Sequence, residues 1–392
     1  MKRLTGWRRY PSLIRRLLDR RVLRLPPRFT WGLLRMMAGE KLTLLNGRLY
    51  VTTHFTPMPS GAFDTALESM VAISRGDARP ISAYISLTDR CRFTCAYCSN
   101  AKEEPAADRT TVEARDAVRQ LQEAGACCIG FTGGEPMLRE DLAEIVATVD
   151  RRSYSVLFTS GHRVDDAAAA RLAQAGLTVA AVSLDSRRAE EQNRVRGSGA
   201  AFDTAVRAIR AFSGAGVYTS VSAVLSPRMA SGSDKLDLVR FCGGLGAHEV
   251  RFLEPIPSGR LAGTERLIGA GERREMERFR RAVNRDPSLP TVAMLSRMES
   301  AECFGCGAGW FHVYVDAAGR VCPCDFVQVP FGKIGEEPFA AVYRRMRDAV
   351  PPFATTCLQS RQRADGTFLA GEGAPPTLLA ALAGLAATGE PE

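Results

Sequence analysis

The sequence predicts an α/β protein in which a parallel sheet curves into a partial barrel. Over residues 81–255, segments typical of strands alternate with segments typical of amphipathic helices, and this alternation indicates a parallel sheet. Glycines stand where several helices should end, as left-handed caps require. The strand–helix unit occurs six times, which is too few for a closed eightfold barrel. We therefore expect an open (β/α)6 partial barrel with its site at the carboxyl ends of the strands.

The expected elements follow one another with short connections. The six strands are expected at residues 81–87, 127–133, 153–161, 177–185, 217–225 and 248–255. The five helices between them are expected at residues 111–125, 139–150, 164–176, 201–216 and 233–242. Gly125, Gly176 and Gly216 stand at the carboxyl ends of three of these segments.

Segments on both sides of this core differ from it in composition. Residues 42–51, LTLLNGRLYV, place Asn-Gly between apolar residues, which is a strong hairpin signal. We expect five parts, namely a basic amino-terminal extension with helices and a hairpin, the barrel core, a connecting helical segment, a cysteine-rich module and an Ala/Gly-rich tail. Their expected ranges are 1–80, 81–260, 261–300, 301–360 and 361–392.

The positive charge of the chain is concentrated at its amino terminus. Residues 1–30 hold ten Lys or Arg and one acidic residue, which accounts for the net charge of +9. Residues 10–25 place apolar side chains on one helical face and arginines on the other. Such a helix either packs on the body of the protein or lies on an anionic membrane surface. Without a long apolar run or a secretory signal, we expect a cytoplasmic protein, peripheral at the membrane in the second case, with no nucleic-acid partner.

Eleven cysteines in a chain without an export signal indicate metal binding or catalysis rather than disulfides. One group lies within eight residues, CRFTCAYC, and a second group lies near the carboxyl terminus. Three thiolates leave one position of a tetrahedral site open. The first group is Cys91, Cys95 and Cys98, and the second is Cys303, Cys306, Cys322, Cys324 and Cys357.

The spacing Cys91-x3-Cys95-x2-Cys98 resembles the radical S-adenosylmethionine (radical SAM) superfamily. The resemblance implies that the three thiolates bind a [4Fe-4S] cluster whose fourth iron is chelated by SAM. Tyr97, before the last cysteine, also fits the family pattern. A zinc knuckle is the alternative for the cysteines alone. The segment after the second strand resembles the family's GGEP motif, which is implied to receive the amino group of SAM and consists here of Gly133, Gly134, Glu135 and Pro136.

Further SAM contacts are implied by the same resemblance. Ser183 and Asp185, at the end of the fourth strand, match positions that commonly face the ribose and carboxylate of SAM. Arg196 stands where family members often have Arg-Gly, and the adenine is expected to pack near 248–255. The resemblance covers about residues 81–255. It implies an electron donor such as a flavodoxin or ferredoxin, reductive cleavage of SAM and hydrogen abstraction from an organic substrate by a 5′-deoxyadenosyl radical.

The second cysteine group resembles the opening of the SPASM and twitch extensions, which hold auxiliary iron–sulfur clusters. Cys306 is followed by twelve residues, Gly319, four residues and Cys324, and the segment between them reads as a hairpin. Only Cys357 follows, which favours a twitch-like module with one auxiliary [4Fe-4S] cluster. Cys306, Cys324 and Cys357 are the expected ligands, with Cys303 or Cys322 as the fourth; an open iron or a zinc site is the alternative.

The remaining cysteines are expected mainly as core thiols, since free cysteine is often buried. Cys128 and Cys242 are also candidates to return a hydrogen atom to a substrate radical, as in some radical SAM epimerases. The substrate hypotheses are a lipid or membrane-associated intermediate, a ribosomal peptide, and a sugar or antibiotic precursor to be oxidised or epimerised. An iron–sulfur scaffold or electron carrier is the non-enzymatic alternative.

Overall fold

The computed structural model describes residues 1–6, 22–37, 39–102, 104–265, 268–300, 303–351, 356–370 and 377–382. Most of the basic helix expected at 10–25 lies outside these residues. Its end is described as a short 3-10 turn, η2 (Val22–Arg24). No helix in the described ranges is long and apolar enough to cross a membrane.

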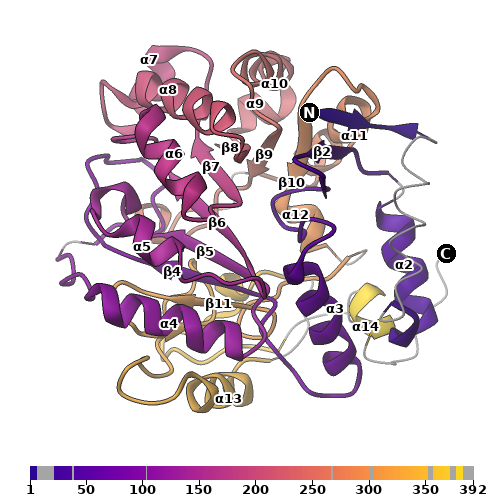
Figure 1. Cartoon of the computed structure of the whole chain (residues 1–392), viewed down its shortest axis with the longest axis vertical. Coiled ribbons are helices and arrows are strands. Elements are labelled where there is room, and N and C mark those ends of the chain that lie inside the picture. The colour runs from indigo at the N-terminus through magenta and orange to yellow at the C-terminus, as the bar shows by residue number, and fades with distance from the viewer. Residues whose placement is uncertain are drawn as a thin grey trace.

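A nine-stranded sheet forms the centre of the molecule, in the order β10-β9-β8-β7-β6-β5-β4-β11-β12 (Figure 1). All neighbours from β10 to β11 run parallel, and only β12 is antiparallel to its neighbour. The six expected strands are confirmed. They are β4 (Ser82–Ser86), β5 (Cys128–Thr132), β6 (Tyr154–Thr159), β7 (Val179–Ser183), β8 (Tyr218–Val224) and β9 (Glu249–Leu253).

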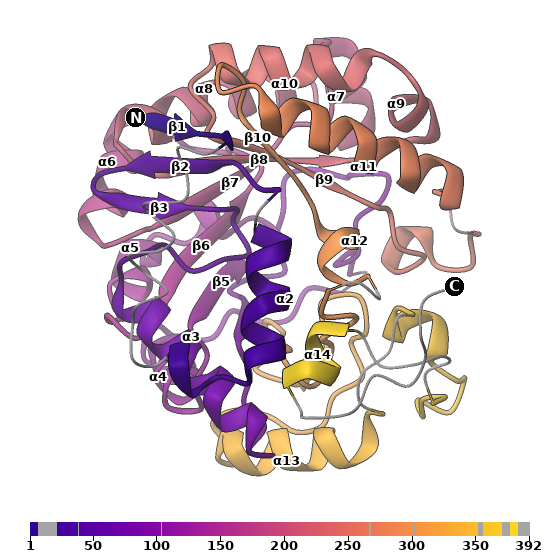
Figure 2. The same cartoon turned by 90° about the vertical axis from the view of Figure 1, so that its right-hand side faces the viewer.

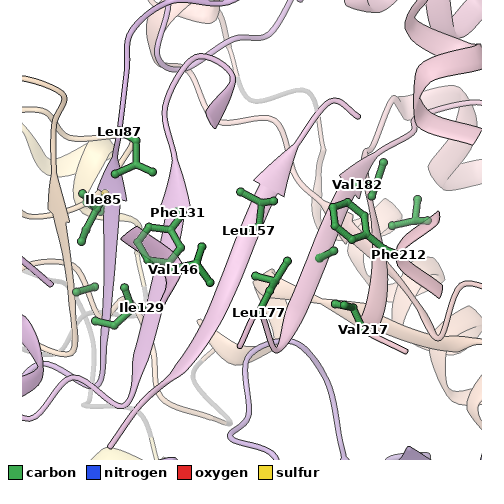
Figure 3. Close-up of a cluster of buried hydrophobic side chains, with 14 of the residues drawn as sticks. Ile85, Leu87, Ile129, Phe131, Val146, Leu157, Leu177, Val182, Phe212 and Val217 are labelled. Atoms are coloured by element: carbon green, nitrogen blue, oxygen red, sulfur yellow. The ribbon is translucent and has the colours of Figure 1, made fainter. Parts of the chain in front are cut away.

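Helices cover the outer face of this sheet (Figure 1). Outward side chains of the strands pack against them in one apolar core, part of which Figure 3 shows around Phe131, Leu157 and Phe212. Both faces of a parallel sheet are normally covered in this way. The helices are α4 (Thr111–Glu123), α5 (Leu142–Val146), α6 (Asp166–Gln174), α7 (Ala189–Arg196), α8 (Ala201–Gly214), α9 (Pro227–Ser231) and α10 (Asp234–Gly244).

The segment 261–300, expected as a helical connection, also contributes a strand. Helices α11 (Ala270–Arg285) and α12 (Leu295–Met298) are present, after a short turn η4 (Gly259–Leu261). Between the two helices, β10 (Thr291–Met294) adds a seventh consecutive parallel strand next to β9. Four residues after a proline are too short for sequence periodicity to identify, and the free edge of β9 provides the pairing.

The amino-terminal extension forms a separate antiparallel sheet of β1 (Lys2–Leu4), β2 (Leu42–Leu45) and β3 (Arg48–Tyr50). The expected hairpin is confirmed, because Asn46 and Gly47 between β2 and β3 both have positive φ, at 49° and 75°. Helices α2 (Pro27–Met37) and α3 (Gly61–Ser74) complete the extension. In the tail, α14 (Thr377–Leu382) packs beside α2 (Figure 2).

The expected hairpin of the cysteine-rich module is also confirmed, as β11 (His312–Val315) and β12 (Val321–Cys322). The turn between them closes through Gly319, whose amide donates to the carbonyl of Asp316 at 3.0 Å. β11 pairs in parallel with β4, so the module continues the barrel sheet at its first strand. Helix α13 (Phe339–Ala349), the 3-10 turn η3 (Pro136–Leu138) after β5, and η5 (Leu358–Arg361) complete the described elements.

A buried ion network joins the extension to α11 and α12. Arg280 lies between Glu40 and Glu277, with nitrogen–oxygen distances of 2.6 Å and 2.7 Å. Arg297 donates to Glu277 at 3.0 Å. Partial burial by itself would raise the pKa of Glu277, but the hydrogen bond and charge of Arg280 outweigh it and lower the pKa to about 2.

We expect this lowered pKa to make the fold sensitive to acid. A carboxyl group whose pKa is lower in the folded state stabilises the fold above its unfolded pKa, near 4.3, and loses this contribution as the pH falls toward 2. The Glu277→Gln substitution should therefore remove roughly 2–3 kcal/mol of the pH-dependent free energy of unfolding. Urea unfolding of both proteins at pH 2 to 6 measures this. If the free energy of unfolding changed equally with pH in the two proteins, the proposed role of Glu277 would be wrong.

Candidate functional site

The first three cysteines lie on one loop after β4, which we call the cysteine loop (residues 91–98). All three thiols are free of disulfides, and Cys91 is exposed while Cys95 and Cys98 are partly buried. The loop is anchored to the end of α7, since the amides of Thr94 and Ala96 donate to the carbonyls of Arg196 and Val195 at 3.1 Å and 3.0 Å. Backbone contacts therefore hold a loop that has no regular secondary structure.

The glycine segment after β5 lies directly against the approach to this loop. The amide of Gly134 donates to the carbonyl of Thr88 at 2.7 Å, and the amide of Glu135 donates to that of Arg90 at 2.8 Å. A Cβ atom at Gly133 would come within 2.3 Å of the Thr88 oxygen, and Gly133 has a φ of +139°. A Cβ at Gly134 would come within 2.2 Å of the Arg90 oxygen. Both positions therefore require glycine for the two segments to approach each other.

Glu135 is turned into the protein rather than toward open space. Its side chain is buried, and its carboxylate accepts hydrogen bonds from Thr159 Oγ1 and the amide of Ser160, both at 2.7 Å. It also accepts from Ser160 Oγ and from the amide of Met137, at the start of η3, which begins at Pro136. Burial raises the pKa of Glu135, and these hydrogen bonds act in the opposite direction. The carboxylate thus fixes the segment after β5 to the end of β6, and contact with SAM stays a prediction.

A buried ion pair supports the cysteine loop from the other side. Arg196 Nε lies 2.7 Å from the carboxylate of Asp185, and Tyr97 donates its hydroxyl proton to the same carboxylate. The Arg196 guanidinium also lies over the Tyr97 ring and 3.9 Å from the sulfur of Cys95. Although burial lowers the pKa of Arg196, the charge of Asp185 outweighs it, and the net shift is upward. A permanent positive charge therefore faces the cysteine loop.

Three residues of this site, Gln192, Gly259 and Arg260, were not predicted from the sequence. Gln192 accepts from the Asp185 amide at 2.8 Å and donates to the carbonyl of Ser183 at 3.2 Å. It lies four residues before Arg196, on the same face of α7, and this spacing is the signal that could have found it. Gly259, with a φ of +55°, allows the segment after β9 to contact the carbonyl of Cys98, and the Arg260 amide donates to that carbonyl at 3.0 Å.

Neither candidate hydrogen-donor thiol is brought to this site. Cys242 is fully buried on α10 in the core outside the sheet. Cys128 is buried at the first residue of β5, whereas Gly133 follows the last residue of that strand. Its thiol interacts with the hydroxyl of Tyr154. Burial raises the pKa of both thiols, as expected for core cysteines.

In the carboxyl-terminal module, Cys306, Cys324 and Cys357 come together. The thiol of Cys357 is hydrogen-bonded to the sulfur of Cys306, which lowers the pKa of Cys306 to about 6. Burial, the nearby charge of Asp325 and that of Cys306 raise the pKa of Cys324. Arg361, which the sequence analysis did not identify, donates a hydrogen bond to Cys306.

The two candidates for a fourth ligand lie in other surroundings. The thiol of Cys303 is 3.5 Å from the sulfur of Met36, in the apolar cluster of the amino-terminal extension. Cys322 is buried on β12 beside Asp316 and Arg320. The structure therefore groups three of the five cysteines.

The donor set suits iron–sulfur clusters. Thiolates are the usual ligands of such clusters, and each of the two groups supplies three cysteines beside a guanidinium, Arg196 or Arg361, that offsets negative charge. Within the described ranges, no group of three or more His, Cys, Asp or Glu side chains is placed so that it could hold a single metal ion. The two sites are also connected, because Gln359 Nε2 donates to the carbonyl of Pro257 at 2.6 Å, two residues before Gly259.

Comparison with known proteins agrees with this geometry. Residues 85–229 match the family model of the radical SAM superfamily, and residues 306–359 match that of the SPASM iron–sulfur cluster-binding domain. The AdoMet-dependent heme synthase of Methanosarcina barkeri is 27% identical over 67% of this chain and 83% of its own length. The PqqA peptide cyclase of Gluconobacter oxydans is 28% identical over 64% of this chain and 71% of its own length.

Among solved structures, Streptococcus suis SuiB bound to the precursor peptide SuiA superposes with a TM-score of 0.59. The match covers 71% of this chain and 68% of SuiB at 15% sequence identity. At this identity the likeness shows a shared fold.

We predict that Gly134→Ala weakens SAM binding by at least about tenfold, or about 1.4 kcal/mol. The added methyl group would meet the Arg90 carbonyl and push the glycine segment away from the cysteine loop. Gly199→Ala is the matched control, because a Cβ there meets no atom within 4 Å. Isothermal calorimetry of the anaerobically reconstituted proteins measures the affinity. Equal affinities of Gly134→Ala and wild type would refute the steric argument.

We also predict that Cys357→Ala lowers the iron content by about four atoms per chain, since it removes a ligand of the second site. Cys303→Ala and Cys322→Ala should keep the wild-type iron content, because both thiols lie apart from the group. Iron is measured by plasma mass spectrometry after anaerobic reconstitution. Loss of iron in either control variant would identify that cysteine as a fourth ligand and correct the grouping described above.

Proposed function

The chain is a radical SAM enzyme with a carboxyl-terminal SPASM extension, and we propose that it abstracts a hydrogen atom from a peptide held inside the partial barrel. The observation that carries the proposal is the cysteine loop, with its three free thiols, fixed against Gly133 and Gly134 at the carboxyl ends of β4 and β5. A protein that only carried electrons would not need a glycine segment for SAM beside its cluster.

The radical SAM domain implies a [4Fe-4S] cluster with SAM, and the SPASM domain implies auxiliary iron–sulfur chemistry. When bound, the reduced cluster would supply one electron to SAM, whose carbon–sulfur bond would then break to give methionine and a 5′-deoxyadenosyl radical. We propose that Cys91, Cys95 and Cys98 hold the first cluster. Cys306, Cys324 and Cys357 would hold one auxiliary cluster, as in a twitch-like module, because residues 358–392 contain no further cysteine.

The residues around the cysteine loop bind and orient. Gly133 and Gly134 let the backbone approach the ligand closely. Ser183, at the end of β7, is a proposed contact for the ribose of SAM. The carboxylate of Asp185, expected to face SAM as well, is instead bound by Arg196, Tyr97 and the amide of Val224, so we propose that Asp185 acts by positioning Arg196. Gln192 fixes the backbones of Ser183 and Asp185. Arg196 places its charge beside Cys95 and stabilises thiolate ligands. Such prealigned groups let the cofactor perform the difficult step while the protein positions the reactants.

A peptide substrate is supported by similarity to PqqA peptide cyclases, one of which aligns with 64% of this chain. A second candidate is a haem precursor, favoured by the haem synthase relatives, one of which is matched over 83% of its length. A lipid substrate at a membrane surface rests on the basic segment, most of which lies outside the described residues. A reduced flavodoxin or ferredoxin is the proposed electron donor for each of these substrates.

The first test is production of 5′-deoxyadenosine by the anaerobically reconstituted, dithionite-reduced protein. We expect stimulation by the aqueous fraction of host extract, and loss of that stimulation when the fraction is first treated with protease. The Cys91/Cys95/Cys98→Ala variant is the control and should give no product. Stimulation that survives protease would exclude a peptide and leave a haem, sugar or antibiotic precursor, and stimulation by the lipid fraction would select a lipid. No 5′-deoxyadenosine from a fully loaded protein would show that the proposed function is wrong.

A further inference from the structure

Arg251 is buried on the inner face of the sheet without a charged partner. It lies in β9 and is 4% exposed, and its guanidinium is 5.2 Å from the ring centre of Phe158 on β6. Its Nε and Nη1 atoms are buried and have no hydrogen-bond partner. In the part of the chain that the structure describes, no carboxylate forms an ion pair with it. A buried guanidinium in this state is costly unless a ligand brings a negative charge.

Glu249, a carboxylate on the same face, already has hydrogen-bond partners of its own. Glu249 lies two residues before Arg251 on the same strand and therefore on the same face. It accepts hydrogen bonds from the amide and hydroxyl of Thr53 at 2.7 Å and 2.9 Å, and from the Tyr218 hydroxyl at 3.1 Å. It interacts with Arg251 electrostatically, without a hydrogen bond between the two side chains. Glu249 thus anchors the amino-terminal extension and leaves Arg251 available.

Three polar side chains surround this guanidinium, and two of them have a buried atom without a hydrogen-bond partner. Tyr84 is hydrogen-bonded to Arg251 through its hydroxyl, and its ring packs 4.9 Å from that of Phe158. Ser222 pairs with Arg251 in the sheet register, and its hydroxyl is buried without a partner. His54 Nε2 is likewise buried without a partner. Burial lowers the pKa of His54 most, and the charge of Arg251 lowers it further.

This group lies in the same row of the inner face as Ser183, the proposed SAM contact. Ser183, at the end of β7, pairs with Ser222, which pairs with Arg251, so all three occupy one row of the inner face. On the other side, Arg251 pairs with Ala293 of β10. Ala293 and His54 line a small hollow between the amino-terminal extension and α12.

We propose that Arg251, with Tyr84, Ser222 and His54, forms a subsite for an anionic group of the substrate, a carboxylate or a phosphate. This inference rests on the proposed function and narrows it, because it requires a substrate that carries such a group. The subsite holds the anion in the row that leads to Ser183, which places the rest of the substrate toward the carboxyl ends of the strands.

The test is binding of two simple anions, propionate and inorganic phosphate, to the reconstituted full-length protein. Saturation-transfer difference NMR follows propionate directly, and phosphate is measured by ³¹P line broadening and by competition. We expect saturable binding of one anion by the wild type, weakened at least about tenfold in Arg251→Gln, because charge-assisted hydrogen bonds are lost. Arg278→Gln, an exposed arginine on α11, is the matched control and should bind like the wild type.

The outcomes separate the two anions and the two proposals. Preference for propionate identifies a carboxylate, and preference for phosphate identifies a phosphorylated group. Arg251→Lys keeps the charge and should retain weaker binding, which serves as the test if Arg251→Gln does not fold. No saturable binding by the wild type, or unchanged binding in the Arg251 variants, would overturn the subsite. A wild type that forms 5′-deoxyadenosine with the extract but binds neither anion would overturn the subsite alone, whereas a fully loaded wild type that forms no 5′-deoxyadenosine counts against the proposed function.

Discussion

The docking of the cysteine loop on its neighbours is the constraint on which the rest of the site depends. The loop has no helix or strand of its own, so its shape comes from hydrogen bonds to backbone groups at the ends of other elements. The end of α7 and the segment after β9 bind the loop directly, and the glycine segment after β5 binds the residues that lead into it. These partners come from distant parts of the sequence. Only a curved parallel sheet brings their carboxyl ends to one edge.

Glycine makes this docking close enough to be specific. Gly133, Gly134 and Gly259 each place the backbone where a Cβ atom would overlap a carbonyl oxygen of a neighbouring segment. One buried ion pair also supports the loop. Asp185 keeps Arg196 charged and in place, and Arg196 in turn faces Cys95 and Tyr97. The positions of the three thiols thus follow from backbone contacts and one buried ion pair.

The carboxyl-terminal module and the amino-terminal extension close the open barrel from two sides. β11 extends the sheet beside β4, and Gln359 contacts the segment that supports the cysteine loop. The extension contacts the inner face through Thr53 and His54 and is held by the network around Arg280. The inner face of the sheet is therefore contacted by the amino-terminal extension, while the carboxyl-terminal module continues the same sheet beyond β4.

The sequence by itself determined the six central strands, the Asn46–Gly47 hairpin, the hairpin around Gly319 and the family. These features depend on local periodicity, on residues that tolerate positive φ, and on short cysteine spacings. The tertiary structure alone decided the rest. It separated Cys303 and Cys322 from the group of Cys306, Cys324 and Cys357, and it turned Glu135 inward. It also added β10 and left Arg251 unpaired in the barrel. Each of these outcomes depends on contacts between residues far apart in the chain, and no local pattern encodes them.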